Sequence, residues 1–281
     1  MHIPKAAVIN DLSGLGKCSL TAAIPILSVM GVQACPLPTG VLSNQTGFPS
    51  YACVNLTDEM ERFIAEWKKR ELLLDGIYTG FLCSVQQAEK TAHFIAQFSN
   101  PKTLILIDPV LGDNGCQYPA LPPEMKDAVQ IFLPYATVIT PNYTEACLLT
   151  GCPYQEPTLE KAWEMACQLS EKGPRIVVIT GIRQNNQVYN AVYTAEPEEK
   201  FFICNQWIGS HGYSGTGDIL ASVLCGGLLK GMDIRQALTL ACHFLEASIR
   251  EAVMDGTDPN EGIAFENHMS LLMKEGPEEN A

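Results

Sequence analysis

Residues 103–108, Thr-Leu-Ile-Leu-Ile-Asp, carry the clearest strand signal in the sequence. The run is short, continuous in apolar side chains and rich in branched ones, which is typical of a strand in a parallel sheet covered by helices. The acidic and glycine-containing residues 108–115 (DPVLGDNG) follow it directly. Ligands bind beyond the carboxyl ends of strands in such sheets, so the residues after each strand are candidate site residues.

Strand and helix patterns alternate on both sides of that run. We predict further strands at 5–10, 32–37, 75–79, 137–140 and 175–180. Helical spacing of apolar residues predicts helices at 20–30, 58–70, 85–98, from about 142, and at 159–171, 217–229 and 234–252. This alternation predicts an α/β fold with a mostly parallel central sheet and helices on both faces. Segments 187–194 and 200–205 flank a polar turn and predict a short antiparallel hairpin.

The chain is expected to form a single domain over residues 1–281. It contains no Pro/Ser-rich linker and no repeat of 20–50 residues. The polar residues 274–281 predict a flexible tail.

The composition excludes several classes of function. The 281 residues carry 18 Lys+Arg against 31 Asp+Glu, a formal net charge of −13, and 47% of them are hydrophobic. That apolar fraction excludes a disordered chain. The negative charge argues against nucleic acid as a partner, because phosphate backbones would be repelled. The 11 cysteines include no C-x-x-C pair, which favours reduced thiols and a cytoplasmic location. No signal peptide and no membrane span are expected.

The segment 214–218, Ser-Gly-Thr-Gly-Asp, opens a long apolar helix. Glycines at a helix start let backbone N–H groups converge on an anion, and the helix dipole favours negative charge there. Asp218 in the same turn has two interpretations. One is ordinary complementarity to the dipole. The other is a general base that takes a proton from a hydroxyl attacking a γ-phosphate, and this one also explains the glycines.

Carboxylates also follow two of the predicted strands. Asp108 and Asp113 come after the 103–108 strand, and Glu145 lies in the first turn of the helix that begins near Asn142. Carboxylate oxygens suit a hard cation such as Mg²⁺. The alternative for the second segment is helix capping, with Asn142 as N-cap and Glu145 as its capping-box partner. The segment alone leaves both interpretations open.

Gly16 and Lys17 do not form a P-loop. That motif needs a glycine five residues before Gly16, where Asp11 stands, and Ser or Thr directly after Lys17, where Cys18 stands. Residues 10–19 are therefore expected to form either a plain strand-to-helix turn or a turn that binds substrate.

Taken together, these segments resemble the ribokinase-like superfamily and, within it, the pyridoxal/pyridoxamine kinases. The resemblance covers nearly the whole chain in the same order, through 42–48 (LSNQTGF), 79–84 (TGFLCS), 108–115, 140–151 (TPNYTEACLLTG) and 214–218. It implies a ribokinase-like three-layer α/β/α sandwich. It also implies an ATP-dependent kinase of the 5′-hydroxyl of pyridoxal, pyridoxamine or pyridoxine, which uses Mg²⁺, with K⁺ as a further candidate cation, and which forms a homodimer.

The resemblance gives the 214–218 segment its catalytic role. Asp218 is similar to the base that deprotonates the 5′-hydroxyl. The backbone amides of Gly215, Thr216 and Gly217 would form the anion hole for the transferred phosphoryl group. Gly215 and Gly217 would also contact the bound nucleotide.

The same resemblance implies metal and nucleotide contacts. Asp113 and Glu145 would organise Mg²⁺, directly or through water. Asn142 would lie close to the phosphates of ATP. Thr180, at the end of its predicted strand, is similar to a position on the nucleotide side.

On the substrate side, the resemblance places the pyridine ring near Asp11, Thr46 and Phe81. Residues 114–124 would form a lid over the substrate, and Cys116 lies at its start. Some family members carry a cysteine in this region that can attack the pyridoxal aldehyde. The alternative is a lid thiol with no covalent role.

The chain departs from the family pattern at two substrate positions. Asp11 stands where many pyridoxal kinases have Ser, and Phe81 stands where Tyr is frequent. Residues 11–14 are more similar to hydroxymethylpyrimidine kinases of thiamine biosynthesis, but those usually have Cys where this chain has Asp218. The alternatives are therefore a hydroxymethylpyrimidine kinase, another small-molecule kinase of the same fold, or a non-catalytic binder of pyridoxal phosphate.

Overall fold

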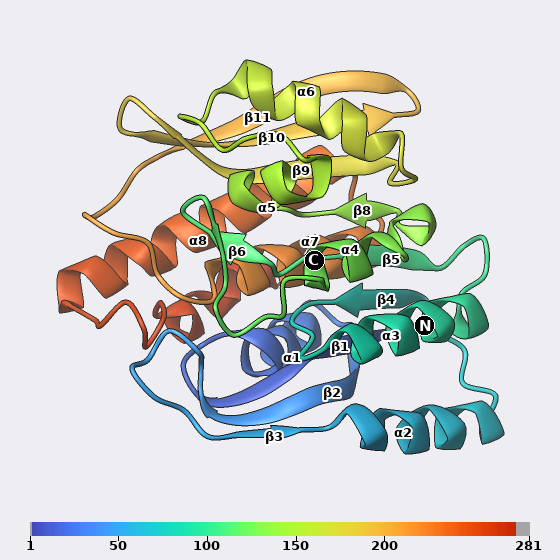
Figure 1. The fold of residues 1–281 in the computed structure, drawn as a ribbon. Helices are drawn as coiled ribbons and strands as arrows, with labels where there is room; N and C mark the ends of the chain where they lie inside the picture. Colours follow the sequence, from blue (N-terminus) through green and yellow to red (C-terminus); the bar gives the residue numbers. More distant parts are fainter. Residues whose placement is uncertain (1, 274–281) are drawn as a thin grey trace, which may run out of the picture.

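A nine-stranded sheet runs through the centre of the molecule (Figure 1). The computed structural model describes residues 2–273, so the tail predicted at 274–281 lies outside the described residues. The strands of this sheet are β1 (Lys5–Leu15), β2 (Gln33–Asn44), β3 (Cys53–Asn55), β4 (Gly76–Thr79), β5 (Leu104–Ile107), β8 (Val138–Ile139), β9 (Ile176–Gln184), β10 (Gln187–Ala195) and β11 (Glu198–Gln206). Their order across the sheet is β11-β10-β9-β8-β5-β4-β1-β2-β3.

The middle of the sheet is parallel and its two edges are antiparallel. Strands β9, β8, β5, β4, β1 and β2 pair in parallel, whereas β3 at one edge and β10 and β11 at the other pair antiparallel. The predicted hairpin is confirmed as β10 and β11. A separate two-stranded hairpin is formed by β6 (Gly112–Asp113) and β7 (Cys116–Gln117).

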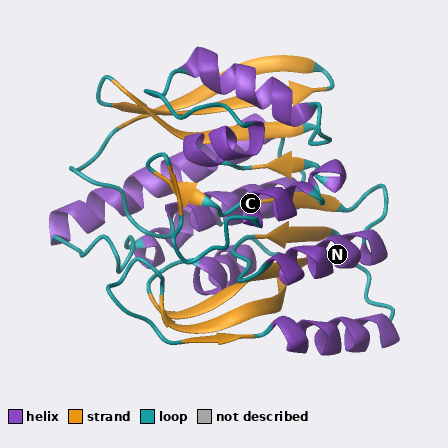
Figure 2. Cartoon of the chain, in the orientation of Figure 1, coloured by secondary structure: helices purple, strands orange, loops and turns teal. Residues whose placement is uncertain are grey.

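Helices cover both faces of the sheet, which confirms the three-layer α/β/α architecture (Figure 2). One face carries α2 (Thr57–Lys69), α3 (Val85–Phe98), α4 (Met125–Gln130), α5 (Tyr143–Thr150) and α6 (Leu159–Ser170). The other carries α1 (Ser19–Val29), α7 (Thr216–Leu229) and α8 (Ile234–Asp255). The short 3₁₀ helices are η1 (Leu133–Tyr135) and η2 (Phe265–Leu272).

Strand β1 shows why the molecule has two cores. Successive side chains of a strand point to opposite faces. Ala7 and Ile9 therefore pack in the core under α2–α6, while Ala6 and Val8 pack in the core under α1, α7 and α8. Residues 6–9 of β1, which are buried on both faces of the sheet, are apolar at every position.

Strands β1 and β2 are longer than the sequence predicted. The prediction ended them at residues 10 and 37, but they run to Leu15 and Asn44, and these two residues are the last pair of their ladder. Residues 11–15 are therefore strand and not a turn. The apolar pattern missed this extension because pairing between neighbouring backbones holds it, and its composition is polar and rich in glycine.

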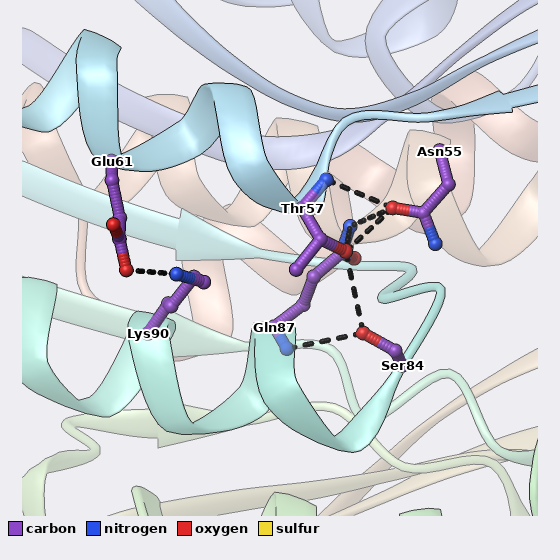
Figure 3. Close-up of polar contacts among 6 residues, drawn as sticks. All are labelled: Asn55, Thr57, Glu61, Ser84, Gln87 and Lys90. Atoms are coloured by element: carbon purple, nitrogen blue, oxygen red, sulfur yellow. Dashed lines mark hydrogen bonds and ion pairs between the residues drawn. The ribbon is translucent and has the colours of Figure 1, made fainter.

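A buried polar network around Gln87 fixes the segment that follows β4, and Figure 3 shows the part of it that joins Gln87 to Thr57 and Ser84. Gln87 at the start of α3 is fully buried. Its Nε2 donates to the Thr39 carbonyl at 2.7 Å and to the Thr57 hydroxyl at 3.0 Å, and its Oε1 accepts from the Cys83 N–H at 2.7 Å. Thr39 Oγ1 donates to the Phe81 carbonyl at 2.9 Å. The network therefore ties the residues after β4 to strand β2.

We expect Gln87→Leu to lower the free energy of unfolding by about 2–4 kcal/mol, measured by urea denaturation, because it removes the buried hydrogen bonds to the Thr39 carbonyl and the Thr57 hydroxyl and leaves the Cys83 N–H without its acceptor. The matched control is Gln86→Leu, the same change at an exposed position of the same helix. The control should stay within about 0.5 kcal/mol of the wild type. Equal losses in the two variants would contradict the role given to the network.

Candidate active site

The middle of β1 and the carboxyl end of β5 meet the first turn of α7. Asn10 comes from β1, Asp108 directly follows β5, and Asp218 is the third residue of α7. Asn10 Nδ2 donates to Asp218 Oδ1 at 3.0 Å. A Cβ atom added to Gly217 would lie 4.0 Å from Asp108 Oδ2. The segments 108–115 and 214–218, far apart in sequence, therefore meet where parallel sheets bind ligands.

The start of α7 has the geometry of an anion hole. Gly215 is its N-cap residue, with φ at 81° and no side chain to bond the first amides of the helix. A Cβ added here would lie 2.0 Å from the Lys17 carbonyl oxygen, so only glycine fits. Thr216 turns its hydroxyl away to the Tyr213 carbonyl at 3.1 Å. The first N–H groups of the helix therefore lack a side-chain cap and can bind an anion.

The Asp218 carboxylate is oriented by hydrogen bonds and has an altered pKa. Burial raises its pKa to about 6, and the nearby charge of Asp11 adds to the rise. The Ser19 N–H and the Asn10 amide act in the opposite direction, because both donate to the charged form. A carboxylate with this pKa is well matched to general-base chemistry near neutral pH.

Asp108 is a buried carboxyl group with one hydrogen-bond donor, the Thr140 hydroxyl at 3.2 Å. Burial raises its pKa well above the ordinary value, and the charges of Glu145 and Asp218 raise it further. A cation bound nearby would favour the ionised forms of these carboxyl groups, so the cluster is suited to bind one.

Glu145 caps helix α5. Its Oε2 accepts from the Asn142 N–H at 2.8 Å, while Asn142 Oδ1 accepts from the Glu145 N–H at 2.9 Å. Its Oε1 accepts from the Leu111 N–H at 3.0 Å. The capping box predicted as one alternative is therefore confirmed. Burial nevertheless raises the Glu145 pKa, and Asp113 raises it further, so the capping carboxyl also belongs to the acidic cluster.

The residues present fit Mg²⁺ that arrives with its own water and phosphate ligands. Over residues 2–273, His, Cys, Asp and Glu form no group of three arranged to hold a metal ion. Asp113 is exposed, and its oxygens accept from the backbone and side-chain amides of Asn114. Mg²⁺ keeps several waters and commonly uses one or two carboxylates plus substrate phosphates. The cluster of Asp108, Asp113 and Glu145 suits that mode of binding.

Asn142, the residue before α5, and Thr180 in β9 are paired in an isolated parallel β-bridge. The Asn142 Nδ2 donates to the Gly112 carbonyl at 2.8 Å. The Asn142 amide thus anchors the β6–β7 hairpin to the start of α5. The contact of these two residues with a nucleotide stays a prediction.

The four predicted substrate residues occupy different environments. Asp11 is buried, and its carboxylate accepts from the hydroxyls of two serines, Ser13 at 2.7 Å and Ser19 at 2.6 Å. Phe81 is half-buried just after β4. Thr46 is exposed in the loop between β2 and β3, and Cys116 is exposed on the β6–β7 hairpin at the start of the predicted lid. Contacts of these residues with substrate stay predictions.

The sequence analysis missed Asn10. This residue is fully buried, and its amide contacts both Asp218 and the backbone of Phe81. The available signal was an amide side chain that ends the apolar run of the first strand, at the edge where ligands bind.

Comparisons with known proteins show which kinases this chain is similar to. A model of the family described as Phosphomethylpyrimidine kinase matches residues 20–262. A solved structure from Bacteroides thetaiotaomicron, provisionally named a phosphomethylpyrimidine kinase, is 41% identical, with a TM-score of 0.93 and coverage of 97% of this chain and 94% of that one. Another crystal form of the Bacteroides protein was solved with pyridoxal.

Two further relatives are named for vitamin B6. The pyridoxal kinase of Lactobacillus plantarum is 30% identical, with a TM-score of 0.87 and coverage of 96% of this chain and 97% of that one. The curated pyridoxine/pyridoxal/pyridoxamine kinase of Bordetella avium is 26% identical over 268 residues, which is 89% of each chain. Among the described residues, no helix is both long and apolar enough to span a membrane.

We expect Gly215→Ala to lower the melting temperature by about 5–10 °C, because the added methyl group collides with the Lys17 carbonyl and the positive φ is strained. Differential scanning fluorimetry would measure the shift. Gly212→Ala is the matched control, since a Cβ there meets nothing within 4 Å. It should stay within about 1 °C of the wild type, and equal shifts in the two variants would contradict the assignment.

Proposed function

The chain belongs to the phosphomethylpyrimidine kinase family, and from that premise we propose that it uses ATP to phosphorylate the 5′-hydroxyl of pyridoxal, pyridoxamine and pyridoxine. The resemblance drawn from the motifs is confirmed at the family level, and the protein is a kinase. The B6 vitamers are favoured because the Bacteroides relative was solved with pyridoxal and the Lactobacillus relative is named a pyridoxal kinase.

The observation that carries this proposal is a carboxylate base, Asp218, on the first turn of a helix without a side-chain cap. Asp218 would take the proton of the 5′-hydroxyl as its oxygen attacks the γ-phosphorus. The bond from the γ-phosphorus to the β,γ-bridging oxygen breaks, and ADP leaves. The amides of Gly215, Thr216 and Gly217 and the α7 dipole would stabilise the charge on the transferred group.

Residues at the start of α5 would hold the phosphates and their cation. Mg²⁺ bound with ATP would neutralise phosphate charge. Asp113 and Glu145 would hold it, directly or through water, with Asp108 behind them. Asn142 and Thr180 would lie beside the nucleotide. The buried carboxyl groups of Asp108 and Glu145 support a cation at this place, because a bound cation would stabilise their ionised forms, and K⁺ is a further candidate.

The pyridine ring would pack against Phe81, with Asp11 and Thr46 toward its polar substituents. The β6–β7 hairpin would start the lid at 114–124, with Cys116 facing the substrate.

A hemithioacetal between the Cys116 thiol and pyridoxal would make Cys116→Ala lower turnover of pyridoxal more than that of pyridoxamine. An unchanged ratio would leave Cys116 with no covalent role.

A second candidate substrate is hydroxymethylpyrimidine, because the matching family model carries the name of a phosphomethylpyrimidine kinase. The sequence of residues 11–14 favours it, whereas Asp218 favours the vitamin B6 kinases. In this chain either substrate would meet Asp218 and the same anion hole, so the pocket near Asp11 and Phe81 would decide between them. We also propose that the protein is located in the cytoplasm and forms a homodimer.

A substrate panel tests the proposal. Purified protein with Mg-ATP would be assayed for ADP release with pyridoxal, pyridoxamine, pyridoxine, hydroxymethylpyrimidine and ribose. We expect turnover with the B6 vitamers only. Turnover with hydroxymethylpyrimidine alone would overturn the vitamer assignment, and ATP binding without turnover of any compound would favour the non-catalytic binder.

The pKa of Asp218 predicts the pH dependence. The base acts when deprotonated, so kcat/KM should fall tenfold per unit as the pH drops below about 6. Asp218→Asn should lower kcat by about a thousandfold or more at every pH, because a neutral amide cannot take the proton. Calorimetry should show that ATP binding persists in this variant. Near-normal turnover by Asp218→Asn would exclude Asp218 as the base.

A further inference from the structure

We propose that Asn10 is the positioning residue of the active site, whose single amide holds both the Asp218 carboxylate and the backbone that carries Phe81. This inference rests on the proposed function, because it concerns the base and the ring-binding segment of the same kinase site. It assigns a role to a side chain that lies one residue before the predicted substrate contact Asp11.

The hydrogen bonds of Asn10 leave its amide one orientation. Its Oδ1 accepts from two backbone N–H groups, that of Phe81 at 2.8 Å and that of Asp11 at 3.0 Å. A carbonyl oxygen can accept both, whereas an NH₂ group cannot. The Nδ2 must therefore face the other way, where it donates to Asp218 Oδ1 at 3.0 Å.

Packing around Asn10 prevents the amide from moving. Its side chain is fully buried. A Cβ added to Gly80 would lie 2.3 Å from Asn10 Nδ2, so the backbone after β4 packs closely against the amide. The β1–β2 register shifts between Asn10 and Leu12, and the two successive polar side chains Asn10 and Asp11 are both buried. Such irregularities redirect side chains next to functional sites.

The consequence is a fixed relation between the base and the ring-binding segment. The amide donates to a carboxylate oxygen, so it holds that oxygen as an acceptor and favours the ionised form of Asp218. The same amide carbonyl sets the position of the Phe81 backbone. A vitamer ring packed on Phe81 would therefore present its hydroxyl to Asp218 at a constant distance, which is what proximity catalysis requires.

Within residues 2–273, the titratable groups that lie near the Asp218 carboxyl are acidic or neutral. They are Asp11 in β1, Tyr78 in β4, Cys18 before α1, Asp108 after β5 and Tyr118 in the predicted lid. None of them carries a positive charge. The Asn10 amide and the Ser19 N–H are therefore the groups that lower the pKa of Asp218.

The test compares two variants that disturb the same segment. Asn10→Ala removes the donor to Asp218, so the acidic limb of kcat/KM should move up by about one pH unit and kcat should fall about 10- to 100-fold. Thr39→Val removes only the hydroxyl that donates to the Phe81 carbonyl. It should raise KM for pyridoxal severalfold and leave the acidic limb at the wild-type pH.

The titration of Asp218 is also measured without turnover, by NMR, from the pH dependence of the ¹³C chemical shift of its carboxyl carbon. The Asp218→Asn variant identifies which signal belongs to Asp218. If Asn10→Ala does not fold, Asn10→Ser should show the same direction of shift, because its shorter hydroxyl cannot reach the carboxylate. A folded Asn10 variant with the wild-type midpoint overturns the inference. Absence of wild-type turnover with every vitamer overturns the proposed function instead, and the carboxyl titration still decides the role of Asn10.

Discussion

Three carboxyl groups, Asp108, Glu145 and Asp218, are held close together at the carboxyl edge of the sheet, where burial penalises their charged forms. The surrounding structure offsets this cost with aligned donors. Glu145 is bonded to backbone amides in a capping box, and Asp218 lies at the positive end of the α7 dipole. A cation bound at this place would favour the ionised forms of these carboxyl groups.

The first turn of α7, which carries the proposed anion hole and base, depends on a close backbone approach. Gly215 packs against the Lys17 carbonyl, which joins the start of α7 to the loop between β1 and α1. Asn10 of β1 makes a second contact with the start of α7 through its bond to Asp218. These two contacts hold the first turn of α7 against β1 and the loop that follows it. Phosphoryl transfer gains most of its rate from such positioning.

Much of the fold was predictable because it follows from local patterns. The 103–108 run had to be a buried strand, and the repeated alternation had to give a parallel sheet with two helical layers. The segment 214–218 indicated an anion site for reasons of backbone chemistry alone. The prediction was wrong at residues 11–15, where polar residues extend β1 because the neighbouring strand pairs with them.

The sequence by itself determined the fold class and the residue types of the candidate site, because apolar periodicity, glycines and carboxylates at strand ends are local properties. Its motifs also carried the resemblance to the family. Only the tertiary structure decided which side chains meet. That Asn10 bonds to Asp218, that Glu145 serves as a cap, and that Asp11 is satisfied by Ser13 and Ser19 depend on contacts between elements. Such contacts leave no periodic trace along the chain, since they arise from packing in three dimensions.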